Sequence, residues 1–155
     1  MTEVAITSIL VPEDFSTHAD RAFRYALMLA RRHDARLQLV HVVEDPFATG
    51  AWAPEVYVPN VTELLHSMIS HAEEQLAALA ASAAAQGVTA DIAVIKGRPA
   101  LAILDHASSG GFDLIVMGTH GRTGLSHAVL GSVAERIVRK ASCPVLTVHA
   151  NEATA

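Results

Sequence analysis

The feature of this sequence that most restricts its fold is a regular alternation of two hydrophobic patterns. Short apolar segments rich in valine, isoleucine and leucine have the length of buried β-strands. Longer segments between them repeat apolar residues every three or four positions, as amphipathic helices do. The predicted strands are 4–11, 35–43, 88–95, 112–117 and 143–149, the last entered through Pro144. Strands that alternate with helices imply a parallel sheet with right-handed crossovers.

Residues that favour helix ends mark the predicted helices. Asp14 and Ser16 can cap the first, and Asn60 with Glu63 can open a long second helix that ends near residue 86. Pro99 suits the first turn of the third helix. The apolar stripes predicted to face the sheet are Phe23, Ala26, Leu27 and Ala30; Leu65, Met68, Ile69, Ala72, Leu76, Leu79 and Ala83; Ala100, Ile103, Leu104 and Ala107; and Val133, Ala134, Ile137, Val138 and Ala141.

The pattern predicts an α/β fold with a single five-stranded, mostly parallel sheet and helices on both faces, flavodoxin-like or Rossmann-like. A chain of 155 residues suits one domain, which we expect over 1–150, with a tail over 151–155. Two strand orders fit. One is the flavodoxin-like order 2-1-3-4-5, and the other is a related order with the third strand at the edge beside the second.

In such a sheet a ligand binds beyond the carboxyl ends of the strands, where the winding reverses. Here this crevice is predicted between the end of the first strand, Pro12-Glu13-Asp14, and the end of the fourth, from Gly118 onward. Asp14 is the one carboxylate that we place in the crevice, where a hydrogen bond to a ribose suits it better than a role as a base.

The segment "GTHGRTGLSHAVLGS", residues 118–132, follows the fourth strand directly. Gly118 ends the strand without a side chain in the crevice, and Gly121 lets the main chain approach a bulky anion. Gly131 and Ser132 fall where the last helix begins, so free N–H groups and the positive helix end suit phosphate there. Ser132 equally fits the ordinary role of an N-cap. As a set, these residues predict a phosphate-binding loop, although each glycine alone suits a turn.

The distribution of charge allows a small anionic ligand and argues against nucleic acid. The net charge is −5, but residues 118–149 carry four basic residues and only Glu135, a balance of +3. The remainder, with seven basic and fifteen acidic residues, carries −8. A basic solvent-facing side of the last helix would give the same local balance.

Several other classes of protein lack their sequence signatures here. No apolar run reaches the length of a membrane span, and the acidic start does not resemble a secretory signal. Cys143, the single cysteine, excludes an internal disulfide and favours the cytoplasm. His66 and His71 are five positions apart, on different faces of a helix, and no His-Glu-x-x-His, Walker A, Gly-x-Gly-x-x-Gly or Gly-x-Ser-x-Gly motif occurs.

Together these features resemble the universal stress protein family, specifically its ATP-binding branch with the pattern Gly-2x-Gly-9x-Gly-[Ser/Thr]. Gly118, Gly121, Gly131 and Ser132 match that pattern without a gap. The resemblance extends over essentially the whole chain. It rests also on "ILVPEDFS" (9–16), "LVHVV" (39–43), "GRP" (97–99), "DLIVMG" (113–118) and "CPVLTVH" (143–149). It implies a fold related to the adenine nucleotide alpha hydrolases.

The resemblance also implies a ligand and its contacts. ATP would bind with Mg²⁺ carried on its phosphates. Asp14 would lie near the adenosine, the main chain of Val42 would meet the adenine, and Pro12 would form a wall. The ribose and triphosphate would be held by Gly118, Thr119, His120, Gly121 and Arg122, and by Gly131, Ser132 and Val133 at the helix start. Family members are commonly homodimers joined through the last strand, here 144–149.

Three functions therefore stay open on the sequence. The chain is an ATP-binding regulatory protein of the stress response, a slow ATP hydrolase or phosphoryl- or adenylyl-transfer enzyme, or an interaction module independent of nucleotide. No catalytic residue can be named that would orient an attacking water. Trp52 and Tyr57 in the proline-rich loop 44–59 would cover the adenine or belong to an exposed variable loop. His120 and His127 would touch phosphate or respond to pH, or would be surface residues.

Overall fold

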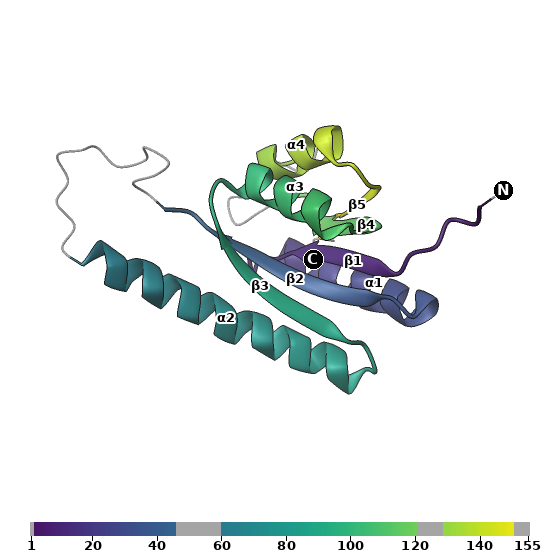
Figure 1. Cartoon of the computed structure of the whole chain (residues 1–155), viewed down its shortest axis with the longest axis horizontal. Coiled ribbons are helices and arrows are strands. Elements are labelled where there is room, and N and C mark those ends of the chain that lie inside the picture. The colour runs from purple at the N-terminus through teal and green to yellow at the C-terminus, as the bar shows by residue number, and fades with distance from the viewer. Residues whose placement is uncertain (1, 46–59, 121–128, 151–155) are drawn as a thin grey trace, which may run out of the picture.

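The computed structural model describes residues 2–45, 60–120 and 129–150. Strands and helices alternate through these residues and form one parallel sheet between two helical layers (Figure 1). The strands are β1 Ser8–Pro12, β2 Arg36–Val43, β3 Ala90–Lys96, β4 Leu114–Gly118 and β5 Val145–Val148. The helices are α1 Thr17–His33, α2 Val61–Ala85, α3 Pro99–Gly110 and α4 Ser132–Lys140. The predicted α/β class is confirmed.

The strand order is β3-β2-β1-β4-β5, with every neighbouring pair parallel. Of the two predicted orders, the one with the third strand at the edge is confirmed and the flavodoxin-like order is wrong. The physical reason is that α2 packs against β2 and β3, and β3 pairs with β2 from Leu37↔Ala90 to Val43↔Lys96. From β1 the chain adds β2 and then β3 on one side of the sheet, and α3 then leads back to β4 on the other side of β1. The direction of winding therefore reverses between β1 and β4.

Each face of the sheet has its own hydrophobic core. Ile9 and Val11 of β1 point to the layer of α1 and α2, whereas Leu10 points to the layer of α3 and α4. The neighbouring strand β4 divides its side chains in the same way and is buried from Leu114 to Met117. Because both faces are covered, β1 and β4 are apolar without the alternation of a half-exposed strand. No helix among the described residues is long and apolar enough to cross a membrane.

The structure changes several predicted boundaries. The first strand begins at Ser8 and not at residue 4, because pairing with β2 starts at Ser8↔Arg36 and Val4 is 90% exposed. The last strand is likewise shorter than 143–149. In α2 the fully buried residues lie from Ala72 onward, while Met68 is exposed. Val138 of α4, predicted to face inward, is also exposed.

The predicted helix caps differ in outcome. Ser16 caps α1, since its Oγ accepts a hydrogen bond from the N–H of Ala19 at 3.2 Å. The predicted stripe of α1 is buried throughout. Asn60 occupies the N-cap position of α2, but its side chain makes no capping hydrogen bond there. The αL backbone of Asn60, with φ at 64°, differs from the extended conformation that suits a side-chain cap.

Candidate functional site

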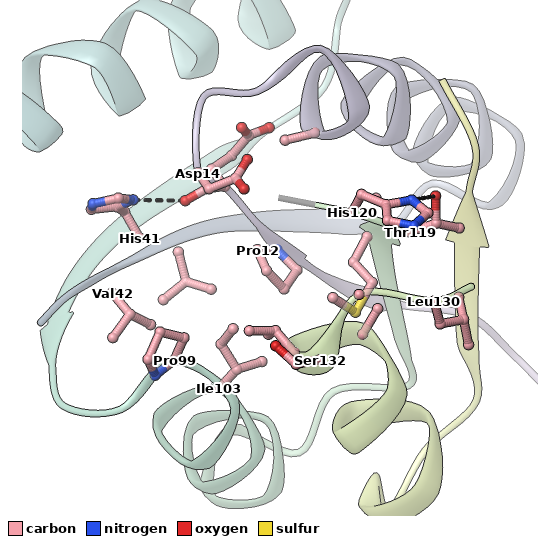
Figure 2. A pocket seen from close by; sticks show the side chains of 18 of the residues that line it. Pro12, Asp14, His41, Val42, Pro99, Ile103, Thr119, His120, Leu130 and Ser132 are labelled. Carbon is pink, nitrogen blue, oxygen red and sulfur yellow. Dashed lines mark hydrogen bonds between the residues drawn. The ribbon is translucent and has the colours of Figure 1, made fainter. Parts of the chain in front are cut away.

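A cavity of about 560 Å³ lies beyond the carboxyl ends of β1, β2 and β4, where the winding of the sheet reverses (Figure 2). The ends of these strands form one wall, and the first residues of α3 and α4 form the opposite wall. The cavity is therefore where the alternation of strands and helices predicted a ligand site.

Every predicted site residue that the structure describes lines this cavity. They are Pro12, Asp14, Val42, Gly118, Thr119, His120, Gly131, Ser132 and Val133. Gly121 and Arg122 lie outside the described residues, as do His127, Trp52 and Tyr57. The structure thus brings three distant parts of the sequence to one opening, while the ligand contacts of each residue stay predictions.

The β1 side of the cavity consists of the segment Pro12–Asp14 together with His41 and Val42 of β2. Hydrogen bonds hold its main chain. The N–H of Glu13 donates to the carbonyl of Val40 at 2.8 Å, and Nδ1 of His41 donates to the carbonyl of Glu13 at 2.7 Å. Oδ1 of Asp14 accepts the N–H of Ser16 at 3.0 Å, which orients the carboxylate at the turn into α1. Hydrogen bonds within the protein therefore hold this side of the cavity.

Glu13 belongs to the strand end that the sequence placed at the crevice, but its carboxyl was not predicted to lie there. It lines the cavity, is only 4% exposed, and its Oε1 is a buried atom without a hydrogen-bond partner among the described residues. Burial, reinforced by the charge of nearby Asp14, raises the pKa of Glu13 from 4.5 to about 8. The prediction of Asp14 as the one carboxylate here is therefore wrong. The overlooked signal was the place of Glu13, immediately after a strand buried on both faces.

The β4 side of the cavity consists of Gly118–His120 and the start of α4 at Gly131–Val133. Gly118 is needed for a reason that the sequence did not reveal. A Cβ added to it would lie 2.8 Å from Cβ of His18 and 2.9 Å from the carbonyl carbon of His18. The predicted purpose of this glycine, an unobstructed crevice, is therefore secondary, because the close approach of α1 already requires it.

Gly131 also departs from its predicted role. Its N–H donates to the carbonyl of Thr119 at 2.8 Å, so the prediction that this N–H is free for phosphate is wrong. Gly131, and not Ser132, occupies the N-cap position of α4, so the N-cap alternative for Ser132 is wrong too. The first N–H groups of a helix have no partner within it, so Ser132, Val133 and Ala134 are the main-chain donors at this helix start, before Glu135 makes the first helical bond to Gly131.

Thr119 and His120 complete the β4 side. Thr119 is fully buried, and its N–H donates to the carbonyl of Val148 at 3.1 Å. Nδ1 of His120 lies 3.0 Å from Oγ1 of Thr119, and its ring packs 5.3 Å from that of His18. Nε2 of His120 is a buried polar atom with no hydrogen-bond partner in the described part of the chain. A ligand in the cavity would supply what this nitrogen lacks.

The chemistry of the lining changes from one end of the cavity to the other. Pro12, Val42, Pro99 and Ile103 give apolar surface on the β1 side and at the start of α3. The start of α4 provides main-chain donors and the positive end of a helix dipole. In the described ranges no three His, Cys, Asp or Glu side chains gather as they would around a metal ion. Cys143 packs against the α3–α4 core, and burial raises the pKa of its thiol.

Comparison with known proteins gives the family. The model of the universal stress protein family matches residues 5–149. A universal stress protein of Thermus aquaticus is 38% identical, over 92% of this chain and 98% of the relative. One from Methanocaldococcus jannaschii is 37% identical, over 90% of this chain and 80% of the relative.

Solved structures agree with the sequence comparison. The universal stress protein UspA of Lactobacillus plantarum superposes with a TM-score of 0.79 at 28% identity, covering 94% of this chain and 99% of the other. Two more distant structures hold nucleotides. One is a universal stress protein in complex with cAMP (TM-score 0.64, 24% identity, 95% of this chain and 99% of the other), and one is an Arabidopsis thaliana family member with AMP bound (0.67, 21%, 94% and 92%). On both kinds of comparison, this chain belongs to the universal stress protein family.

Proposed function

We propose that this chain binds ATP in the cavity between β1 and β4, and that occupancy of the site regulates its shape or its partners in a stress response. The observation that carries the proposal is the construction of the cavity. One continuous opening joins the apolar surface of Pro12, Val42, Pro99 and Ile103 to the start of α4. A nucleotide has the same division, with a flat base at one end and an anionic phosphate chain at the other.

In the proposed complex the adenine lies against Pro12 and the main chain of Val42, and Asp14 accepts a hydrogen bond from the ribose. The phosphates extend toward the N–H groups of Ser132 and Val133 and toward His120. Gly118 to Arg122 would complete the phosphate cradle, as the family pattern predicts. Mg²⁺ would bind through the phosphate oxygens, as is usual for this ion.

The relatives that hold AMP and cAMP support an adenine nucleotide as the ligand class. ATP is the specific proposal because this chain carries the full Gly-2x-Gly-9x-Gly-Ser pattern at 118–132. We assign no catalytic residue and propose that the protein acts through nucleotide occupancy, with hydrolysis at most slow.

Assembly and location complete the proposal. β5 is an edge strand of the sheet, and Leu146 on it is 36% exposed, so a second copy of the chain would cover this edge through residues 144–149. The single cysteine, Cys143, suits the reducing cytoplasm, where we place the protein. A regulatory protein partner would respond to the nucleotide state.

Calorimetric titration with MgATP tests the proposal, using Ser132→Asp as the decisive variant. Aspartate at the first position of α4 favours the helix dipole but repels phosphate at the proposed donors. We expect saturable binding by the natural chain and a loss of affinity of about tenfold or more in the variant, equivalent to about 1.4 kcal/mol. Thr62→Asp, which adds the same charge to the first turn of α2 away from the cavity, is the matched control.

The outcomes separate the three functions that the sequence left open. Absence of saturable binding at millimolar MgATP would overturn the proposal and favour a module independent of nucleotide. Product analysis of the same mixtures distinguishes the regulatory protein from the enzyme. Turnover well above about one per minute, a rate that is already slow for an enzyme, would identify a hydrolase or transferase. Retention of intact ATP would support the regulatory role.

A further inference from the structure

We propose that His41 is a positioning residue that sets the β1 side of the cavity for the adenosine part of the ligand. The inference deepens the proposed function and rests on it. Its basis is a single imidazole ring that joins two strand ends on which the adenosine contacts are proposed to lie. In Figure 2 His41 extends from the end of β2 toward the segment that carries Asp14, and a hydrogen bond connects them.

The hydrogen bond fixes both the direction and the tautomer of the ring. Nδ1 of His41 lies 2.7 Å from the carbonyl oxygen of Glu13. A carbonyl oxygen only accepts, so Nδ1 must carry the proton. Protonation at Nε2 leaves this donor in place, so the bond persists whether the ring is neutral or charged. Together with the bond from the N–H of Glu13 to the carbonyl of Val40, it ties the residue after β1 to β2 at two points.

The other contact of the ring supports the turn that follows. His41 packs against Phe15 with ring centroids 4.9 Å apart and an angle of 30° between the planes. Phe15 has φ at 63°, a left-handed conformation that is unfavourable for a large side chain. A ring stacked on Phe15 helps to hold this conformation, and the turn in turn sets the direction of Asp14.

The place of His41 in the chain links these contacts to the ligand. His41 directly precedes Val42, whose main chain is proposed to meet the adenine. It is also hydrogen-bonded to the carbonyl of Glu13, which lies between Pro12 and Asp14. Side chains alternate along a strand, and Val42 packs with the α3–α4 core. The ring of His41 therefore stays beside Glu13 and Phe15 and sets the distance between the two strand ends without needing to touch the ligand.

Two substitutions separate the donor from the ring. His41→Phe keeps an aromatic ring for Phe15 but cannot donate to the carbonyl of Glu13. His41→Asn loses the ring but retains an amide donor near the position of Nδ1. We expect His41→Phe to weaken AMP and ATP binding by the same factor, about tenfold, since one part-buried hydrogen bond is at stake. His41→Asn should restore most of the affinity.

Comparison with Ser132→Asp gives a readout that a general loss of structure would not produce. That variant acts at the phosphate end and should weaken ATP more than AMP, whereas His41→Phe should weaken both equally. Calorimetry with the two nucleotides measures this pattern, and thermal unfolding without nucleotide checks that each variant is folded. If His41→Phe does not fold, His41→Leu and His41→Asn form a second pair of similar size that differs in the donor.

The results that would overturn the inference are distinct from those that would overturn the proposed function. If the natural chain binds AMP and the variants lacking the donor bind it equally well, His41 is not a positioning residue and the proposed function stands. If the natural chain binds neither AMP nor ATP, the proposed function is wrong and the role of His41 falls with it.

Discussion

The β1 side and the β4 side of the cavity are built by different means. On the β1 side, side chains reinforce the main-chain bond from Glu13 to Val40, through the hydrogen bonds from Nδ1 of His41 to the carbonyl of Glu13 and from the N–H of Ser16 to Oδ1 of Asp14. On the β4 side, main-chain groups hold one another, through the bonds from Thr119 to Val148 and from Gly131 to Thr119. The first side can therefore be changed by point substitution of functional groups, whereas the second depends on close approach of backbone.

This difference changes how the glycine pattern of the family is interpreted. Gly118 faces atoms of His18 closely enough that packing alone explains it, whereas at Gly131 the nearest atom to an added Cβ would be the carbonyl oxygen of Thr119 at 3.1 Å. The donors offered to a ligand lie one residue later, at Ser132 and Val133. A glycine pattern of this kind therefore indicates a fold in which a helix start is brought beside a strand end, and the proposed ligand binding would use that arrangement.

The largest expected effect concerns Glu13 and would show whether the β1 side depends on a bound proton. Its pKa is raised to about 8, so the folded protein binds more protons than the unfolded chain between about pH 4.5 and 8. The contribution of Glu13 to the free energy of unfolding is fully present below this pH range. It falls as pH rises through the range, by at most about 1.4 kcal/mol per pH unit. Urea unfolding of the natural chain and of Glu13→Gln across this range measures the slope.

The neutral amide of Glu13→Gln should abolish this component of the slope and make the variant the more stable protein at pH 8. Glu74→Gln on the exposed surface of α2 is the control and should keep the natural slope, because Glu74 is not among the charges that shift the pKa of Glu13. Parallel slopes for the natural chain and Glu13→Gln would show that the carboxyl of Glu13 is ionised in the folded state. The β1 side would then not depend on a bound proton.

The next largest effect tests whether packing explains Gly118. In Gly118→Ala the added Cβ would meet Cβ and the carbonyl carbon of His18, both under 3.0 Å. We expect a loss of about 1–3 kcal/mol in the free energy of unfolding, as for other overpacked sites, measured by urea denaturation without nucleotide. Gly131→Ala, whose nearest contact is 3.1 Å, should cost less. An unchanged stability in Gly118→Ala would show that this glycine serves the ligand and not α1.

The smallest effect concerns a carboxylate at the opposite end of the sheet, just before the first residue of β4. Oδ2 of Asp113 accepts hydrogen bonds from Thr7 and Ser8, which lower its pKa. Its contribution is therefore present above the ordinary pKa of aspartate and is lost as pH falls through the lowered value. Asp113→Asn should cost less than about 1 kcal/mol near pH 7, because the site is largely solvated. Urea unfolding and MgATP titration would check this. A change in affinity for MgATP would contradict the expectation that the amino ends of the strands are independent of the cavity.

Much of the architecture was predictable because it depends on local pattern. The nine elements and their order follow from hydrophobic periodicity, and the cap at Ser16 follows from a residue preference. The sequence narrowed the strand order only to two possibilities, because β3 could either pair with β2 at the edge of the sheet or lie between β1 and β4. Periodicity does not contain that information.

The site divides in the same way. The sheet topology predicted the segments after β1 and β4, and the family resemblance added Val42; those that the structure describes line one cavity. The sequence did not reveal the buried carboxyl of Glu13 or the contacts of His41, whose importance comes from what surrounds them in three dimensions.

The sequence by itself determined the class of fold, the family and the end of the sheet at which a ligand would bind, since these depend on periodicity and on the spacing of residues along the chain. Only the tertiary structure decided which N–H groups stay available at the start of α4, why Gly118 must lack a side chain, and which carboxyl holds a proton. Those properties arise from contacts between separate segments of the chain, as between Thr119 and Gly131 or between His18 and Gly118, and such contacts exist only once the sheet has assembled.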